Sequence, residues 1–263
     1  PTFGRVPAAY NRPGGWRPLS QNGPLSNNVR DSALLLQIMS GQDSTDATSF
    51  EDHQSDFVAD TTPDSLKGFR IAWSPNLDGR PVDSEVRELT LSAALAFQEL
   101  GASVDEATPE LVTNDLKEIF KTFILTDLLI NLEPYLASEQ VKLLPKGLRQ
   151  LLDEAQTWPA TRYSLHLREL EWHKARLAHF FSQYDLLLLP TMAVPSFPIN
   201  QAPNMIDGVP VEPFWGFAPF CFPFNLSGHP AASIPCGFTK KELPVGLQIV
   251  GGMGNEKAIF KAS

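Results

Sequence analysis

The sequence has 263 residues, enough for one large α/β domain, and with 43% hydrophobic and 19% charged residues it can bury a core. The formal net charge of −9 argues against a broad basic face for nucleic acid and against docking on an anionic membrane surface. No apolar run approaches the roughly 20 residues of a membrane-spanning helix, and the first residues lack the pattern of a signal peptide. Two cysteines, Cys221 and Cys236, make neither a disulfide framework nor a metal site. We therefore expect a cytoplasmic protein.

The first predicted helix follows an irregular, proline-rich entry segment. Ser26 is a suitable N-cap residue, and Gly41 stands where a left-handed residue commonly ends a helix. The apolar positions of the helix fall on one side and predict the face that packs on the core: Val29, Ala33, Leu34 and Ile38.

A β–α–β pattern comes next. Phe69–Trp73 is a short apolar strand, a helix runs from about Asp83 to Leu100 and ends at Gly101, and Ser103–Glu106 is the second strand. Short joints between a strand, a helix and a strand indicate parallel pairing through a right-handed crossover.

Residues 110–183 are predicted to be mostly helical and to form an insertion within the domain. One helix is marked by residues from Leu116 to Leu128, and a second by Leu165, Trp172, Leu177 and Phe180. Three histidines lie on the second helix, and we expect them to be exposed or to cap the helix rather than to bind a metal: His166, His173 and His179.

The last third of the chain is rich in extended segments. Asp185–Leu189 is predicted to be a buried parallel strand. Residues 191–230 form a long aromatic loop, which either packs on the core or forms the wall of an apolar pocket. Ala231–Phe238 and Val245–Val250 are predicted to pair antiparallel, and a final helix begins near Asn255.

Common self-sufficient catalytic motifs are missing from the sequence. It contains no Gly-x-Ser-x-Gly elbow, no Ser-x-x-Lys and no His-Glu-x-x-His. Cys221 could serve as a nucleophile in principle, but no histidine or acid lies near it in sequence. We expect no catalytic residue, no metal and no cofactor from these residues alone.

Six segments, in order, resemble motifs of the amidase signature family, and together they indicate the C-terminal half of such an enzyme. Leu66–Ala72 resembles the entry of a family strand, "LKGLRIA", and Tyr184–Thr191 resembles "YDLLLTPT". The other matching segments are Pro1–Pro7, Gly23–Asp31, Pro223–Gly237 and Pro244–Gly251.

This resemblance implies a fold and an activity. The fold would be a large mixed, mostly parallel β-sheet flanked by helices, with residues 1–263 as the C-terminal part of a single domain. The activity would be hydrolysis of a small carboxylic amide by a Ser–cis-Ser–Lys triad, in which one serine attacks the carbonyl carbon. The family's triad lies N-terminal to the segment that matches Pro1, so we expect this segment alone to be inactive.

The resemblance also implies one wall of a substrate pocket. Family members with an apolar acyl pocket build this wall from the segment after the "TPT" strand and from the one before "PFN". The corresponding residues here are Thr191 and Cys221, with Trp215 and Phe217 nearby. The family usually has threonine at the position of Cys221, so we expect a less polar pocket with an apolar or aromatic substrate group.

Two alternatives stay open. One is an inactive scaffold or binding homologue. The other is the glutamine-hydrolysing branch of the family that serves the tRNA amidotransferases, which Ala218 disfavours because that branch has an aspartate there to hold the substrate amino group. If other strands complete the sheet, its exposed edges predict self-association, for example as a homodimer.

Overall fold

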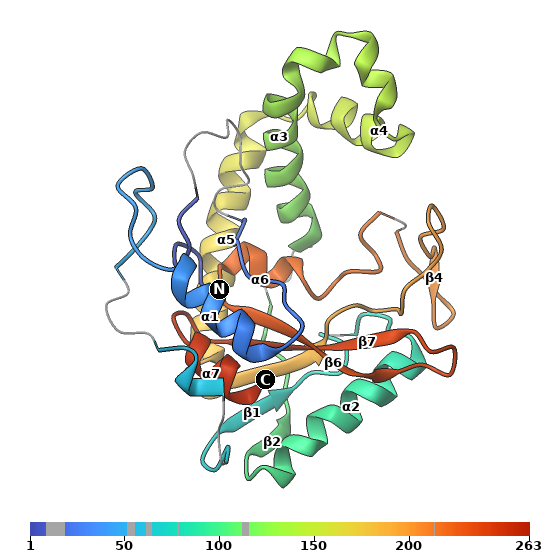
Figure 1. The fold of residues 1–263 in the computed structure, drawn as a ribbon. Coiled ribbons are helices and arrows are strands. Elements are labelled where there is room, and N and C mark those ends of the chain that lie inside the picture. Colours follow the sequence, from blue (N-terminus) through green and yellow to red (C-terminus); the bar gives the residue numbers. More distant parts are fainter. Residues whose placement is uncertain (9–18, 52–55, 62–64, 78, 112–115, 213) are drawn as a thin grey trace.

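The computed structural model describes residues 1–263 except 9–18, 52–55, 62–64, 78, 112–115 and 213. A five-stranded sheet lies at its centre, with helices on both faces and a helical arm that extends away from it (Figure 1). This arrangement agrees with the expected mixed α/β fold. Among the described residues, no helix combines the length and apolar character needed to cross a membrane.

The strand order of the sheet is β2-β1-β3-β7-β6. β1 pairs in parallel with both β2 and β3, whereas β7 pairs antiparallel with β3 and with β6. Four of the five strands therefore point the same way, and β7 alone is reversed. The predicted parallel and antiparallel pairs are confirmed, with the strand bounds Arg70–Trp73, Ser103–Glu106, Leu186–Pro190, Ala231–Phe238 and Pro244–Gly251 for β1, β2, β3, β6 and β7.

Strand β3 forms the centre of the core, because all five of its residues are buried. Alternation of side chains sends Leu186 and Leu188 to one face of the sheet and Leu187 and Leu189 to the other. The first face packs on α2 (Ser84–Glu99) and α7 (Glu256–Ala262), and the second packs on the end of α5 (Ala160–Phe180). Such a continuous aliphatic run is typical of a strand covered on both faces.

Helix α2 confirms the prediction made for it. The Asp83 side chain accepts hydrogen bonds from the backbone N–H groups of Glu85 and Val86, which is the usual stabilisation of a helix start. Gly101, just beyond the helix, has a φ of 92°, a conformation that favours glycine.

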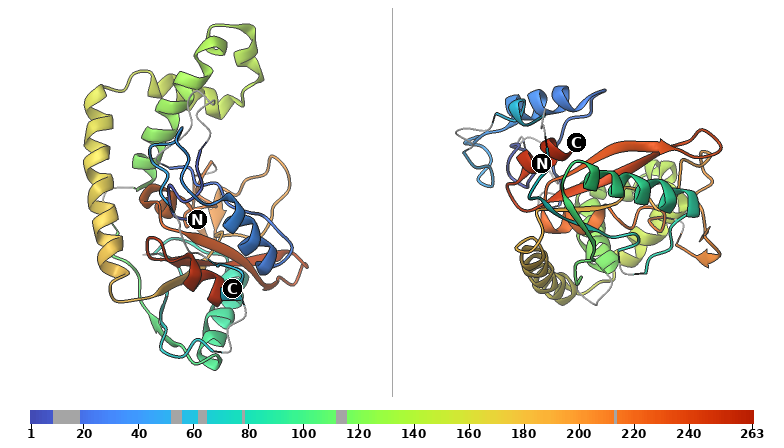
Figure 2. Two further views of the ribbon diagram at one scale, coloured as in Figure 1. Left: turned by 60° about the vertical axis from the view of Figure 1, so that its left-hand side comes forward. Right: turned by 90° about the horizontal axis from the view of Figure 1, so that it is seen from below.

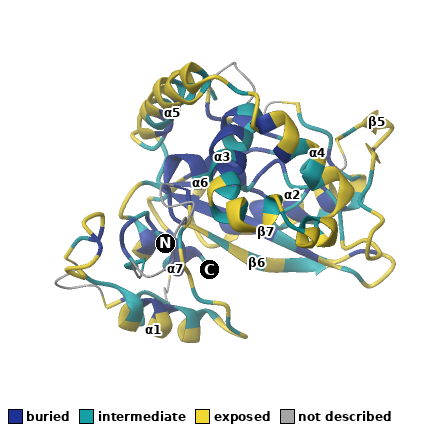
Figure 3. Ribbon diagram, turned by 90° about the horizontal axis from the view of Figure 1, so that it is seen from above, coloured by how far each residue is buried: buried dark blue, intermediate teal, exposed yellow. Residues whose placement is uncertain are grey.

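Helix α1 (Val29–Met39) differs from its prediction at two points. Asn28, and not Ser26, is the N-cap, since its side chain accepts from the Asp31 backbone N–H. Of the predicted face, Ala33 is buried, but Leu34 and Ile38 are exposed, because the helix packs through Ala33 and Leu36. Figure 3 shows α1 with much of its outer side exposed.

The arm consists of α3 (Leu116–Leu136), a 3-10 turn (Glu139–Leu143), α4 (Lys146–Ala155) and α5, and α3 and α4 extend away from the sheet (Figure 2). Leu177 and Phe180 of α5 are buried as predicted, but Leu165 and Trp172 are exposed. His173 also departs from its prediction, because it is fully buried and its Nε2 lies 2.8 Å from the Pro223 carbonyl oxygen.

The predicted aromatic loop contains more structure than expected. A short hairpin, β4 (Met205–Ile206) and β5 (Val209–Pro210), is followed by a helix, α6 (Phe222–Ser227). Gly228 ends α6 with a φ of 78°.

The first residues of the chain lie against its last helix. Glu256 Oε1 accepts hydrogen bonds from the Thr2 backbone N–H at 2.6 Å and from Arg5 Nε at 2.5 Å. Both charged side chains are almost fully buried. The pair therefore joins residues that are about 250 positions apart in sequence.

Candidate functional site

A cavity of about 340 Å³ opens beside the C-terminal end of β3. In parallel sheets this end of the strands is the usual place for ligands. The residues that line the cavity come from the start of α2, from two parts of the aromatic loop and from the start of β7, and most of them are apolar. They are Val86, Met192, Val194, Pro195, Ser196, Phe197, Phe217, Pro244, Val245 and Gly246.

Two hydroxyl groups meet beside this cavity. Thr191 directly follows β3, and its Oγ1 lies 2.7 Å from Ser233 Oγ on β6. Gly246 of β7 lies between them, and a Cβ at that position would be 2.7 Å from Ser233 Oγ and 2.9 Å from Thr191 Oγ1. The missing side chain at position 246 thus lets the two hydroxyls meet across the intervening strand.

Cys221 contacts the backbone of Thr191. Its Sγ donates a hydrogen bond to the Thr191 carbonyl oxygen at 3.4 Å. Burial raises the pKa of the Cys221 thiol to about 11, so the group is a neutral thiol at neutral pH. A nucleophilic cysteine needs the opposite shift, which argues against a nucleophilic role for Cys221.

Phe217 lies on the cavity wall. Its carbonyl oxygen accepts a hydrogen bond from the Ala193 backbone N–H at 3.0 Å, which ties the later part of the aromatic loop to its first residues after β3. Its ring packs edge-to-face on Phe197, with 5.0 Å between ring centroids. The two rings form an apolar surface suited to a flat or aliphatic group.

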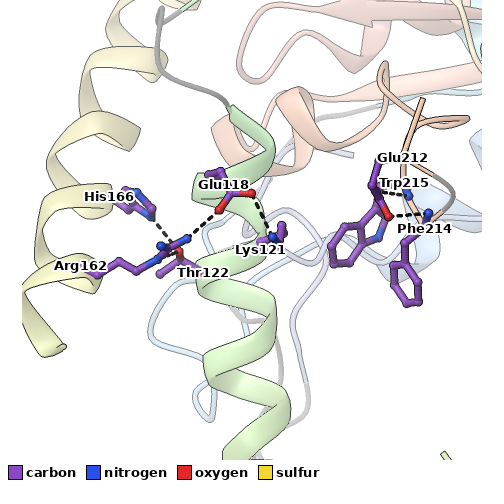
Figure 4. Close-up of polar contacts among 8 residues, drawn as sticks. All are labelled: Glu118, Lys121, Thr122, Arg162, His166, Glu212, Phe214 and Trp215. Atoms are coloured by element: carbon purple, nitrogen blue, oxygen red, sulfur yellow. Dashed lines mark hydrogen bonds and ion pairs between the residues drawn. The ribbon is translucent and has the colours of Figure 1, made fainter. Parts of the chain in front are cut away.

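Trp215 belongs to a different environment. Its ring packs edge-to-face on Phe120 of α3, with 6.0 Å between centroids, and joins the hydrophobic cluster of the arm. The Glu212 side chain accepts from the backbone N–H groups of Phe214 and Trp215 and holds this turn (Figure 4). The structure thus places Cys221 in contact with Thr191 and Phe217 on the cavity wall, and it directs Trp215 to the arm. Thr191 and Cys221 are not among the residues that line the cavity.

The aromatic loop therefore combines both roles considered for it. Phe217 and Phe197 line the cavity, whereas Phe220, Phe222 and Phe224 are buried in the core. The sequence analysis named the segment after the "TPT" strand as a wall of the pocket, but it did not single out Ser233 or Gly246. Ser233 and Gly246 lie within the motifs that carried the resemblance, and this was the one available signal.

Two buried histidines contact α6. His173 Nε2 donates to the Pro223 carbonyl oxygen, and His229 Nδ1 lies 2.9 Å from Ser227 Oγ. Burial, and secondarily the proximity of His173, lowers the pKa of His229 to about 4. Burial also lowers the pKa of His173. Both rings are neutral at pH 7, and the described residues contain no group of three His, Cys, Asp or Glu side chains placed to hold a metal.

Comparison with known proteins defines the class. The family model described as Amidase matches residues 1–260. A bacterial aryl acylamidase structure of the amidase signature family superimposes with a TM-score of 0.89 at 25% identity, covering 100% of this chain and 56% of that one. The chain belongs to the amidase signature family.

Curated relatives include two kinds of enzyme. An acylamidase of Rhodococcus erythropolis is 32% identical over 266 residues, with coverage of 100% of this chain and 55% of the relative. A glutamyl-tRNA(Gln) amidotransferase component of Enterococcus faecalis is 30% identical over 285 residues, with coverage of 100% and 57%. The chain thus spans just over half the length of these relatives.

Proposed function

We propose that this chain forms one wall of the substrate pocket of an enzyme that hydrolyses a carboxylic amide with an apolar or aromatic group. The observation that carries the proposal is the cavity at the end of β3, with Phe197 and Phe217 on its wall. Among the similar proteins, one relative is named an acylamidase and one solved structure is described as an aryl acylamidase, which supports this substrate class. The Thr191–Ser233 hydroxyl pair adds polar groups beside an otherwise apolar surface.

In this proposal the bond-breaking groups are a Ser–cis-Ser–Lys triad supplied from outside residues 1–263. The described part of the chain contributes shape and apolar contact, and it holds no activated thiol at the cavity, since the Cys221 pKa is raised to about 11. We accordingly expect the 263-residue chain alone to be inactive, and the complete polypeptide that contains it to be active.

Glutamine-dependent transfer is the second candidate, since glutamyl-tRNA(Gln) amidotransferase components are among the relatives. The aliphatic and aromatic lining of the cavity, and Ala218 in the loop beside Phe217, offer no acid for an α-amino group. A homodimer in solution also remains part of the proposal, through the sheet edges left open by the described strands.

The test is a substrate panel offered to the complete polypeptide and to the 263-residue chain, with released amine or ammonia as the readout. Aryl and alkyl amides should be hydrolysed by the complete polypeptide, and none of them by the 263-residue chain alone. Phe217→Ala should lower kcat/KM for the aryl amides about 10-fold or more, because a hydrophobic contact in the pocket is lost. Phe238→Ala, an exposed position at the end of β6, is the matched control.

Each alternative has its own outcome. Hydrolysis of glutamine alone by the complete polypeptide would favour the amidotransferase branch. Failure of the complete polypeptide on every amide would favour an inactive scaffold. Serine-dependent hydrolysis by the 263-residue chain would show that the triad need not come from elsewhere.

A further inference from the structure

A second cavity, of about 500 Å³, lies in the arm, between α3 and the beginning of α5. It shares no lining residue with the cavity beside β3. The residues that line it are Thr122, Phe123, Thr126, Asp127, Leu129, Ile130, Ala155, Trp158, Pro159, Ala160, Arg162, Tyr163 and Ser164.

Asp127 is the acidic group of this cavity. Its Oδ2 atom is buried and has no hydrogen-bond partner among the described residues. Burial raises the pKa of Asp127, a hydrogen bond with Asn131 opposes this in part, and no neighbouring cation contributes. The residue as a whole is half-buried, but a carboxylate oxygen that is buried without a partner is unfavourable. The broad terminal torsion of aspartate lets either oxygen turn toward a ligand.

Arg162, the basic side chain on the wall, is already engaged by other groups. Arg162 donates from Nε to Thr122 Oγ1 at 2.9 Å and pairs through Nη2 with Glu118 Oε2 at 2.8 Å (Figure 4). Its guanidinium also stacks on Trp158, 4.0 Å from the ring centroid. Glu118 also accepts from Lys121 Nζ at 3.0 Å, so Arg162 and Lys121 are both engaged with this carboxylate. Among the described residues, neither cation forms an ion pair with Asp127, which is the acidic group on the cavity wall.

Much of the remaining wall is apolar, although it also carries the hydroxyl groups of Thr122, Thr126 and Ser164. The Phe123 and Tyr163 rings pack edge-to-face, with 5.0 Å between centroids, and link α3 to α5. Leu129, Ala155 and Trp158 supply further apolar surface. A hard metal ion needs six or more oxygen ligands, which a single carboxylate in this setting does not approach. The lining instead suits a ligand with one positive charge and an apolar body.

We propose that the cavity of the arm binds an organic amine, with its ammonium group on the Asp127 carboxylate and its apolar part against Phe123, Leu129 and Trp158. A charge-assisted hydrogen bond of this kind supplies the partner that Asp127 lacks. The proposal is independent of amide hydrolysis and concerns a different part of the molecule.

Calorimetric titration of the purified 263-residue chain at pH 7.5 tests it, with 2-phenylethylamine as the probe and the uncharged 2-phenylethanol as its neutral counterpart. The amine should bind at least about 10-fold more tightly than the alcohol, since a buried ionic hydrogen bond contributes about 1.5–3 kcal/mol. Asp127→Asn should reduce amine affinity to that of the alcohol. Asp153→Asn, on the exposed side of α4, should change nothing.

A second variant tests the location without altering the charge. Ala160→Phe, at an exposed lining position at the start of α5, should fill the cavity and weaken binding of both probes. The proposal is overturned by absence of amine binding, by equal affinity for the two probes, or by an unchanged Asp127→Asn variant. Loss of amine binding in Phe217→Ala would also overturn it, since this would place the amine in the cavity beside β3.

Discussion

Thr191 and Ser233 are in hydrogen-bond contact, 2.7 Å between hydroxyl oxygens, although β7 lies between β3, which Thr191 directly follows, and β6, which carries Ser233. Position 246 of β7 has no side chain, and this allows the contact. The arrangement joins the end of β3 to β6 above the backbone of β7, beside the cavity that we assign to substrate.

Gly246→Ala is expected to destabilise the protein by about 1–3 kcal/mol, the usual cost of an extra methyl group in a packed site. The new Cβ would contact both hydroxyl oxygens and push them apart. Urea unfolding measures the change. In a Ser233→Ala background the penalty should be smaller, because one of the two contacting atoms is gone.

Gly147→Ala is the matched control for this prediction. Gly147 lies within α4, and a Cβ there meets no atom within 4 Å. Alanine favours a helix over glycine by up to about 1 kcal/mol, so this variant should be neutral or stabilising. An equal loss of stability in the two variants would contradict the role given to Gly246.

The Cys221 thiol should resist alkylation in the native state. With its pKa raised from 9.0 to about 11 by burial, the thiolate fraction at pH 8 is about 100-fold lower than for a free thiol. In a Cys236→Ser background, Cys221 is the single cysteine, and iodoacetamide labelling should be at least about 100-fold faster in urea than in buffer. Rapid labelling of the native protein would show that Cys221 is activated.

His229 should make the protein sensitive to mild acid. Its pKa is lowered from 6.5 to about 4 by burial, so the unfolded chain takes up a proton that the folded chain excludes. This stabilisation is complete above pH 6.5 and is lost as the pH falls toward 4. The expected loss from this group between pH 7.5 and pH 5 is roughly 2 kcal/mol.

Comparison of variants isolates the contribution of His229. The difference in unfolding free energy between pH 7.5 and pH 5 should be smaller in His229→Gln than in the unchanged protein. His179→Gln alters an exposed ring on α5 and should leave the difference as it was. If both variants behave like the unchanged protein, His229 does not carry the effect.

Glu256→Ala should destabilise the protein by about 3–5 kcal/mol, because it leaves a buried positive charge at Arg5 without this partner. It also removes the acceptor of the Thr2 N–H group. The exposed pair Lys174–Glu171 provides a control, since Glu171→Ala should change stability by less than about 1 kcal/mol. Thermal or urea unfolding distinguishes the two.

Much of the sheet could be predicted because local pattern determines it. The aliphatic run of β3, with no polar residue to turn toward solvent, could be accommodated only at the centre of a covered sheet. Helix faces were harder to predict. Leu34 and Ile38 share a side of α1 with Ala33, yet the helix packs through Ala33 and Leu36. The buried face of α1 depends on where its packing partners Phe57 and Phe260 lie, which is not visible in the sequence of the helix.

Part of the candidate site could not be read from the sequence. Trp215 lies two residues before Phe217, and nothing in this spacing indicates that the Trp215 ring packs on Phe120, about 95 residues earlier in the chain. The importance of Gly246 depends on two hydroxyls from different strands, a relationship that has no local signature. The predicted residues Phe217 and Cys221 lie near the end of β3 because the loop returns there, where Phe217 bonds to Ala193 and Cys221 bonds to Thr191.

The two borders of the sheet differ in chemistry. β2 ends with Asp105 and Glu106, whose charges discourage a further strand from pairing there, whereas β6 carries no charged residue from Ala231 to Phe238 and has a single proline. A strand from another polypeptide would therefore meet more electrostatic resistance at the β2 border than at β6. If the proposed homodimer forms through a sheet edge, β6 is the border that favours it.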